Sequence, residues 1–305
     1  MMATSSNFWQ RLSTPQKPIL ALAPMAGITD GAFRKLCGDF GADVVYSEMA
    51  NVKALSYQPD KTLDMLRDRE RNAPLVVQLF GSDPEFFQTA IKLVEKEIQP
   101  DGIDINFGCP APKVTKTKAG AELFQDPDLS REVIRACIEA TDLPISIKTR
   151  TRVGQVGLFD FWERIKDLDI KAIMIHGRSF SQGFSGDIDE ETIKQIKNKF
   201  NGAVLANGGI NNYQDAETVL KNTGADGVGV ARGAMGNPWL FQEIKEGRET
   251  TKSREQIFYT ALKHAELLQE LRGERGIIEM RKHLCWYVQG LSGAKEMRRR
   301  LIQVN

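Results

Sequence analysis

Short runs of apolar residues alternate with longer stretches of helical periodicity along most of the chain. Each run is rich in Ile, Val, Leu and Ala, which is typical of strands buried on both faces of a parallel sheet. The pattern predicts eight strands, at residues 19–23, 43–47, 75–79, 102–106, 145–148, 172–175, 203–206 and 227–230.

Helix start signals stand between these strands. Asp83-Pro84-Glu85 precedes a helical pattern over 86–98, and Asp126-Pro127-Asp128 precedes another over 129–140. In both, the acid can cap the first turn, and proline suits the first helical position. Eight strand-helix units over about 240 residues predict an α/β fold, a closed parallel TIM barrel.

The pattern changes after the eighth strand. A last barrel helix is expected through residue 245, and a polar segment follows it. Apolar positions then recur every three or four residues, at 258, 262, 265, 268 and 271 and again at 277, 280, 284, 288 and 291. We therefore predict a barrel catalytic domain (1–245), a linker (246–253) and a small all-helical domain (254–305).

Composition limits the class of protein. Hydrophobic residues make up 41% and charged residues 27% of the 305 residues, as in an ordinary globular protein. There is no run of 18 apolar residues, and the first residues lack a charged-then-apolar order, which argues against a membrane span and a secretory signal. The net charge is +1, with +4 in residues 254–305 and −3 in the rest. The predicted helical domain is therefore the basic part.

Cysteine and histidine usage points away from metals. The cysteines stand far apart without a C-x-x-C pair, which argues against a disulfide framework and a zinc site and suits a reducing cytoplasm. His176, His264 and His283 also lie far apart in the sequence, and no H-E-x-x-H motif occurs. We expect no metal and no membrane contact, and we expect a monomer.

Catalytic groups of a TIM barrel come from the C-terminal ends of its strands. At one such end the strand 102–106 runs into Gly108, Cys109 and Pro110, and the glycine and proline force the chain out of the strand. A thiol held there suits proton or nucleophile chemistry. The alternative is that Cys109 packs as a small hydrophobe, as many free cysteines do.

The last two strands end in Asn207-Gly208-Gly209 and in Ala231-Arg232, and a helix follows each. Backbone N–H groups in such turns can bind a phosphate, and Arg232 adds positive charge. TIM barrels often bind phosphate after strands seven and eight. The same residues could instead form plain tight turns, since glycine is the default turn residue.

Three other strand ends carry polar side chains. Lys148 ends an apolar strand, where it could face the N1–C2 edge of a reduced flavin or pair with a carboxylate at the rim. His176 could donate to a flavin or pyrimidine carbonyl, or be a core histidine. The Gln78 amide could bond the edge of a ring or simply lie at the rim.

In the predicted helical domain, Lys282 and Trp286 fall on the side opposite the apolar stripe, at about 100° per residue. A solvent-facing tryptophan beside a lysine suits stacking on a base or sugar, and Arg281 and the arginines at 298–300 suit phosphates. The alternative is a solvated charged face with Trp286 docked on the barrel.

Taken together, these stretches resemble the tRNA-dihydrouridine synthases, FMN-dependent reductases with a TIM barrel followed by a helical tRNA-binding domain. The resemblance covers about residues 18 to 290. Its segments follow one order: 23–30 (APMAGITD), 47–49 (SEM), Gln78, 104–110 (DINFGCP), Lys113-Val114, Lys148, 176–178 (HGR), 207–209 (NGG) and Trp239. Arg281-Lys282-His283 with Trp286-Tyr287 is similar to the bacterial B-type subgroup.

The resemblance implies a role for each candidate residue. Cys109 would be the proton donor. FMN would be contacted by Pro24, Met25, Ala26, Gln78, Lys148 and His176 and, at its phosphate, by Asn207, Gly208, Gly209, Ala231 and Arg232. The implied contacts with tRNA are Asn106, Lys113, Arg178, Arg281, Lys282 and Trp286.

The activity implied is reduction of specific uridines to 5,6-dihydrouridine in the D-loop region of tRNA, with NADPH or NADH as the reductant of FMN. Hydride would pass to C6 of the uracil and the Cys109 proton to C5. The thiol should therefore have a pKa near or above the ~8.5 of a free cysteine.

Two rival functions stay open. One is a flavoprotein acting on a free pyrimidine, against which the basic tail argues, because a small substrate needs no phosphate track. The other is a non-catalytic tRNA-binding module on an inactive barrel.

Overall fold

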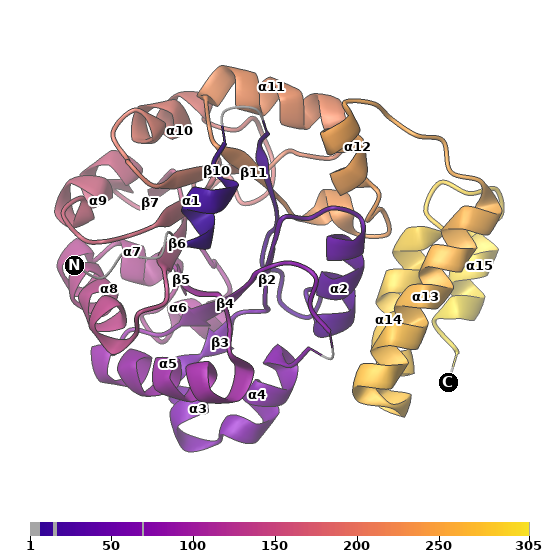
Figure 1. Cartoon of the computed structure of the whole chain (residues 1–305), viewed down its shortest axis with the longest axis horizontal. Helices are drawn as coiled ribbons and strands as arrows, with labels where there is room; N and C mark the ends of the chain where they lie inside the picture. The colour runs from indigo at the N-terminus through magenta and orange to yellow at the C-terminus, as the bar shows by residue number, and fades with distance from the viewer. Residues whose placement is uncertain (1–6, 15–16, 69, 305) are drawn as a thin grey trace.

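The computed structural model describes residues 7–14, 17–68 and 70–304. Within them, eight parallel strands close into a barrel ringed by helices (Figure 1), so the predicted TIM-barrel fold is confirmed. The barrel strands are β1 (Ile19–Leu22), β2 (Val44–Tyr46), β4 (Leu75–Phe80), β5 (Gly102–Asn106), β6 (Ile145–Arg150), β9 (Ala172–His176), β10 (Ala203–Asn207) and β11 (Gly227–Val230).

The barrel closes where β1 pairs with both β2 and β11, and where β2 pairs with β4. Each barrel strand lies within two residues of the bounds that the apolar runs predicted. Outside the barrel cycle, β3 (Ala50–Asn51) extends the edge of β4, while β7 (Arg152–Val153) and β8 (Val156–Gly157) form an antiparallel pair.

Helices surround the barrel (Figure 1). The predicted start signals of two of them are confirmed, because the carboxylates of Asp83 and Asp126 accept hydrogen bonds from backbone N–H groups of the first turn. The helices of this part are α1 (Phe8–Leu12), α2 (Gly31–Asp39), α3 (Val52–Tyr57), α4 (Pro59–Leu66), α5 (Pro84–Ile98), α6 (Pro112–Thr115), α7 (Ala121–Phe124), α8 (Pro127–Ala140), α9 (Leu158–Ile165), α10 (Glu190–Lys197), α11 (Tyr213–Thr223), the 3₁₀ helix η1 (Arg232–Ala234) and α12 (Leu240–Glu246).

The core has two layers because successive strand residues face opposite sides of the sheet. In β1, Ile19 and Ala21 belong to the cluster inside the barrel, whereas Leu20 and Leu22 pack outward beneath the helices. Trp9 of α1 is buried in the inner cluster. The interior is thus filled by side chains, and the open space lies at the strand ends.

Three more helices follow the barrel and lie beside α2 (Figure 1). They are α13 (Arg254–Arg272), α14 (Glu274–Tyr287) and α15 (Ala294–Leu301). Ala32 and Leu36 of α2 share one apolar cluster with Leu268 and Met280 of this tail. The polar segment lies between α12 and α13, as expected. The division into two domains stays a prediction, and the domain ends at 1–6 and 305 lie outside the described residues.

The buried face of α14 differs from the predicted stripe. Its buried residues are Gly276, Met280, His283 and Tyr287. Trp286 is half-buried, with its ring edge-on to that of His283 at a centroid distance of 5.3 Å, so the prediction of a solvent-facing tryptophan is wrong. The hydrophobic pattern failed here because a histidine ring, counted as polar, packs in the interior.

His264 and His283 are brought together, with ring centroids 4.5 Å apart. The inference that the histidines lie too far apart to share a site is therefore wrong for this pair. The physical reason is the turn at Gly273, which folds α14 back along α13 (Figure 1).

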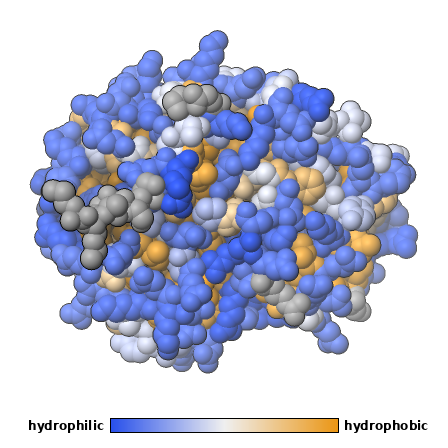
Figure 2. All heavy atoms as spheres, viewed as in Figure 1, coloured by the Kyte–Doolittle hydropathy of each residue, from blue (hydrophilic) through white to orange (hydrophobic). Residues whose placement is uncertain are grey.

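Among residues 7–14, 17–68 and 70–304, no helix combines the length and the apolar character that a membrane crossing requires. Hydrophilic side chains cover most of the face shown in Figure 2, and hydrophobic residues appear between them in scattered groups.

The pairing of β11 with β1, which helps to close the barrel, brings Gly227 opposite Ile19 and makes this glycine sensitive to substitution. A Cβ there would lie 2.1 Å from the carbonyl oxygen of Ile19 on the paired strand, and backbone cannot move aside cheaply. Gly227→Ala should lower the free energy of unfolding by about 3 kcal/mol or more, measured by urea denaturation. Gly229→Ala is the control, because its Cβ would meet the flexible Met174 side chain instead. Equal losses in the two variants would contradict this account.

Candidate active site

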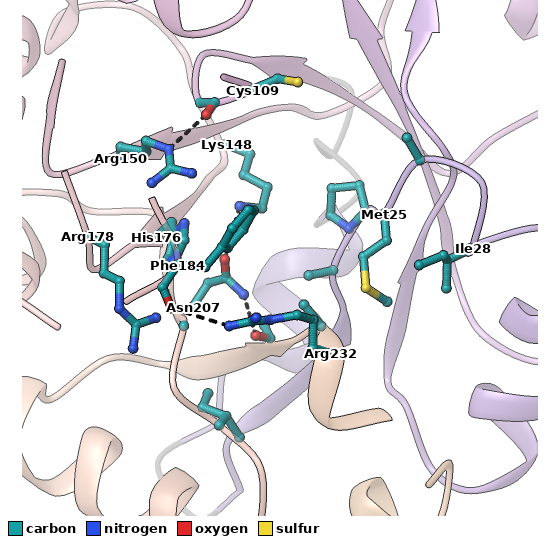
Figure 3. A pocket seen from close by; sticks show the side chains of 18 of the residues that line it. Met25, Ile28, Cys109, Lys148, Arg150, His176, Arg178, Phe184, Asn207 and Arg232 are labelled. Carbon is teal, nitrogen blue, oxygen red and sulfur yellow. Dashed lines mark hydrogen bonds between the residues drawn. The ribbon is translucent and has the colours of Figure 1, made fainter. Parts of the chain in front are cut away.

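A cavity of about 390 Å³ opens at the C-terminal ends of the barrel strands, where this fold usually places its chemistry. In Figure 3, Met25 and Ile28 from the loop after β1 lie across the cavity from Arg150 and Arg178. The described residues that line it include no carboxylate and several cations. The cavity is therefore suited to an anionic ligand.

The cavity gathers most of the residues that the sequence singled out. The lining includes Cys109, the expected cofactor contacts Pro24, Met25, Ala26, Gln78, Lys148, His176, Asn207, Gly208, Gly209, Ala231 and Arg232, and two expected tRNA contacts, Asn106 and Arg178. Lys113, Arg281, Lys282 and Trp286 lie outside it. The roles of all these residues stay predictions, since lining a cavity does not identify its ligand.

Cys109 lies at the rim of the cavity and is partly exposed. Its N–H donates to the side-chain oxygen of Asn106 at 2.9 Å, and its carbonyl accepts from the N–H of Ala121 at 3.1 Å. Burial raises the pKa of the thiol, although the charges of Arg150 and Lys148 oppose the rise. A thiol that keeps its proton suits an acid better than a nucleophile.

A buried chain of hydrogen bonds positions the Cys109 loop. The carboxylate of Asp104 accepts from Gln78 Nε2 at 2.7 Å and from Ser146 Oγ at 2.8 Å. Gln78 Oε1 accepts from Asn106 Nδ2 at 2.8 Å, and Asn106 Oδ1 accepts from the N–H of Cys109. Because an amide group has one accepting and one donating end, the carboxylate fixes the orientation of both amides.

Lys148 extends from β6 into the cavity (Figure 3). Its Nζ donates to Asn207 Oδ1 at 3.0 Å, and Asn207 Nδ2 donates to the carbonyl of Gly229 at 2.6 Å. Burial lowers the pKa of Lys148 to about 8, and the charge of Asp104 opposes this. The ammonium group is thus held at the centre of the site by neutral partners and can serve an anionic or carbonyl-rich ligand.

His176 lies among cations. Its pKa is lowered to about 2 by burial and by the charges of Lys148, Arg150, Arg178 and Arg232. The ring is therefore neutral at physiological pH, with one donating and one accepting nitrogen. Such a ring suits the carbonyl and N–H edge of a flavin or a pyrimidine.

The glycine turn after β10 brings the backbone close to this histidine. Gly208 and Gly209 have φ of +106° and +75°, and a Cβ on Gly208 would lie 2.7 Å from His176 Cδ2. Only glycine fits there, so peptide N–H groups approach the cavity closely. With Arg232 beside the neighbouring turn, this cradle fits a phosphate, and the donors of Lys148 and His176 fit the ring of FMN.

The sequence patterns missed Phe184, which lies on the loop between β9 and α10. It lines the cavity at 59% exposure, with the guanidinium groups of Arg150 and Arg232 at 5.7 and 5.0 Å from its ring centroid. Arg150 also donates to the carbonyls of Ser179 and Gly183 on this loop, each at 3.0 Å. The loop has no periodicity from which Phe184 could be predicted to line a site. Arg150, in contrast, ends a barrel strand, and that position could have identified Arg150 as a candidate.

Lys282 contacts the loop after β1. Its Nζ donates to the carbonyl of Gly27, and the N–H of Gly27 donates to the carboxylate of Glu48. Gly27 directly follows the lining segment 24–26, so α14 is tied to one wall of the cavity. The pair is 255 positions apart in the chain, and no sequence pattern links them.

The other predicted tRNA contacts outside the cavity lie at the surface or near it. Lys113 is exposed on α6, and Arg281 Nε donates to the carbonyl of Val304 at 2.9 Å. Trp286 is half-buried beside His283.

The buried chain of hydrogen bonds predicts losses of different size for two substitutions of Asp104. Asp104→Leu leaves Gln78 Nε2 without its acceptor and Ser146 Oγ with only the 3.4 Å hydrogen bond to the Ile103 carbonyl. It should lower the free energy of unfolding by about 2 to 4 kcal/mol and weaken retention of the flavin. Asp104→Asn can still accept from Gln78 and donate to the serine, so its loss should be smaller. Urea denaturation and flavin fluorescence measure the two effects. Equal effects of the two substitutions would contradict the role of Asp104 in positioning the Cys109 loop.

Stability should also depend on pH through this carboxyl. Burial raises the pKa of Asp104 to about 7, whereas an unfolded Asp titrates near ~3.9. The folded state thus binds the proton more tightly, and this contribution to stability is present below about pH 4 and lost as the pH rises to about 7. In Asp104→Asn this downward part of the stability curve should be missing. If the free energy of unfolding of Asp104→Asn fell with pH in parallel with that of the unsubstituted protein, the raised pKa of Asp104 would be contradicted.

The chain matches the family model described as Dihydrouridine synthase (Dus) over residues 21–305. It is 36% identical to tRNA-dihydrouridine synthase B of Vibrio vulnificus (strain CMCP6) over 289 residues, which cover 92% of this chain and 89% of the relative. It is 33% identical to the probable tRNA-dihydrouridine synthase of Aquifex aeolicus (strain VF5) over 288 residues, with 93% and 90% covered.

Solved structures with little sequence identity share the fold. The structure of histamine dehydrogenase from Rhizobium sp. 4-9 has a TM-score of 0.58 at 14% identity, with 79% of this chain and 48% of that chain covered, so this chain spans about half its length. The crystal structure of TcOYE with pHBA has a TM-score of 0.55 at 11% identity, with 83% and 98% covered. The family match over most of the sequence, with relatives above 30% identity, shows that this chain belongs to the dihydrouridine synthase family.

Proposed function

We propose that this protein reduces specific uridines to 5,6-dihydrouridine in the D-loop region of tRNA, with FMN as cofactor and NADPH, or NADH, as reductant. The relatives named tRNA-dihydrouridine synthases support the reaction and the substrate. One observation carries the proposal: a thiol with a raised pKa, Cys109, lies at the rim of the cavity that also holds Lys148 and the Gly208-Gly209 cradle.

The cavity offers a partner for each part of FMN. The N–H groups of the two late turns and the charge of Arg232 would hold the phosphate. Ring contacts would come from the segment 24–26 and from Gln78, Lys148 and His176. When bound, FMN would take electrons from NADPH and supply a hydride to C6 of the uracil.

Cys109 would complete the reduction. Its Sγ–H bond breaks as the proton passes to C5 of the uracil, so hydride and proton together saturate the C5–C6 bond. The thiolate left behind is stabilised by the nearby charges of Arg150 and Lys148, which already lower the pKa of this thiol against the effect of burial. Water then returns the proton.

The substrate base has to leave its stack to reach this cavity, since the thiol lies at the rim of an enclosed site. The cationic lining would neutralise backbone phosphates that come close to the mouth. We assign the tRNA contacts to Asn106 and Arg178 at the cavity and to Lys113, Arg281, Lys282 and Trp286 around it. The net charge of +4 on residues 254–305 supports the tail as the main tRNA-binding part.

We also infer that the protein works as a monomer in the cytoplasm. All four cysteines are free, which suits a reducing compartment.

The rival with some support is a flavin enzyme that acts on a free pyrimidine, since the cavity alone could admit one. The basic tail favours tRNA, because a free base offers no phosphates for it to bind. The two functions separate in one comparison: reduced flavin should be reoxidised anaerobically by unmodified tRNA transcript and not by free uracil or uridine.

Replacing the thiol tests the assigned acid. Cys109→Ala should retain FMN and its reduction by NADPH, and should lose about 10²- to 10⁴-fold in the rate at which tRNA reoxidises the reduced flavin, because the proton donor is gone. Flavin absorbance under anaerobic conditions follows both half-reactions. Cys285→Ala removes a thiol outside the cavity and is the matched control. Unchanged reoxidation in Cys109→Ala would overturn the role of the thiol.

A further inference from the structure

A buried cluster of metal-ligating side chains lies where the barrel meets the tail. Asp30 precedes α2, His264 lies in α13 and His283 in α14. One ligand atom of each lies within 4.8 Å of the others. The two histidines are 0% exposed and Asp30 is 3% exposed, so all three side chains are buried.

Three ring nitrogens of this cluster lack a hydrogen-bond partner among the described residues: Nε2 of His264 and both nitrogens of His283. The nearest acceptor, Asp30 Oδ2, is 3.6 Å from His283 Nε2, beyond hydrogen-bond length. A buried polar group that is left unpaired destabilises the folded state. A native interior rarely leaves three together.

The remaining polar atoms of the cluster are occupied in a way that orients the ligands. His264 Nδ1 lies 3.2 Å from the hydroxyl of Tyr287, so its Nε2 faces away from that partner. Asp30 Oδ1 accepts from the N–H of Phe33 at 3.0 Å, which leaves Oδ2 toward His283. Outer partners of this kind fix the ligands in known metal sites.

We propose that Asp30, His264 and His283 bind one divalent transition-metal ion and that Zn²⁺ is the best match. Two imidazoles and one carboxylate suit zinc, cobalt or nickel, whereas Mg²⁺ and Ca²⁺ need oxygen ligands. Bonds of about 2.0 to 2.1 Å in a tetrahedral site place ligand atoms about 3.3 Å apart. The ligand atoms, now up to 4.8 Å apart, would close by at most about 1.5 Å.

An entry route reaches the cluster. Asp30 also lines a neighbouring cavity of about 300 Å³, together with Gly27, Glu48 and Lys282. Water from that side can take the fourth coordination position. Because Asp30 is the N-cap of α2 and the two histidines lie in α13 and α14, the ion joins the barrel to two helices of the tail. The ion would therefore crosslink the two parts of the chain, and its binding would be coupled to their packing.

The test uses the full-length flavoprotein, produced without a histidine tag. After dialysis against Zn²⁺ and then metal-free buffer, mass spectrometry of the metal should find about one Zn²⁺ per chain. Co²⁺ in its place should give the visible absorption bands of a tetrahedral site, and thermal unfolding should shift upward when Zn²⁺ is added to chelator-treated protein.

The variants separate binding from folding. Asp30→Asn keeps the cap of α2, since asparagine caps as well, but lacks the charged ligand, and should lower Zn²⁺ affinity at least ~100-fold. His264→Gln and His283→Gln should do the same, and Tyr287→Phe should lower the affinity by roughly 10- to 100-fold. Cys285→Ala, on α14 outside the cluster, should keep full stoichiometry. Circular dichroism and flavin content verify that each variant is folded.

Two outcomes would overturn the proposal. One is a folded wild-type chain that binds no Zn²⁺ and shows no thermal shift, which would mean that Asp30 and the two histidines simply pack together in the interior. The other is Zn²⁺ binding that persists in the folded His264→Gln, His283→Gln double variant, which would place the ion elsewhere. Neither outcome bears on uridine reduction, which the Cys109→Ala assay tests separately.

Discussion

The arrangement of the cavity floor depends on the hydrogen bonds of one buried carboxylate. Asp104 is fully buried between β4 and β6, where a charge is costly, and Gln78 and Ser146 offset part of that cost. In return, the carboxylate fixes the orientation of the neighbouring side-chain amides. The side-chain amides of Gln78 and Asn106 could each turn over without a change in shape, and only an acceptor at the base of the chain selects one orientation. That orientation holds the backbone at Cys109, so the position of the thiol follows from a residue that does not line the cavity.

The second constraint is the set of cations above this floor. Lys148, Arg150, Arg178 and Arg232 face one another without a lining carboxylate, and neutral partners hold three of them. Arg150 and Arg178 donate to backbone carbonyls, and Lys148 donates to the Asn207 amide. These charges are thus fixed before any ligand arrives, which is the preorganisation that makes electrostatic stabilisation effective. Burial and the charges of these same cations lower the pKa of His176, which keeps its ring neutral.

Much of this site could be predicted from the sequence because the fold itself assigns positions. A strand buried on both faces leaves a strong apolar run, and the ends of those runs pointed to Lys148, His176 and Asn207. The glycine turn was visible because a positive φ and a close approach select one residue type. These signals are local, and each requires only a few neighbouring residues.

What the sequence missed depends on contacts between distant segments. Phe184 lies on an aperiodic loop, and Lys282 reaches Gly27 across most of the chain. The pairing of His264 with His283 depends on how α14 folds back on α13, and hydropathy counts both rings as polar although they are fully buried. Sequence patterns therefore identified the strand ends that line the cavity and not the contacts by which the tail holds the loop after β1.

These contacts between the tail and the loop after β1 bear on how a tRNA held by the tail would meet the thiol. The segment between α12 and α13 could by itself allow many orientations, but α14 contacts the barrel part at several points besides their shared apolar cluster. Lys282 bonds Gly27, His283 lies against Asp30, and the backbone of Trp286 fits against Gly236, where a Cβ would lie 2.5 Å away. All three points are in the segments after β1 and β11, which also border the cavity. The tail thus packs against the loops that border the cavity, and this packing sets the distance from its basic surface to Cys109. If the tail binds tRNA as proposed, the choice of uridine would follow from how far a base on the docked tRNA can reach, because the tail would hold the whole tRNA at one position relative to the thiol.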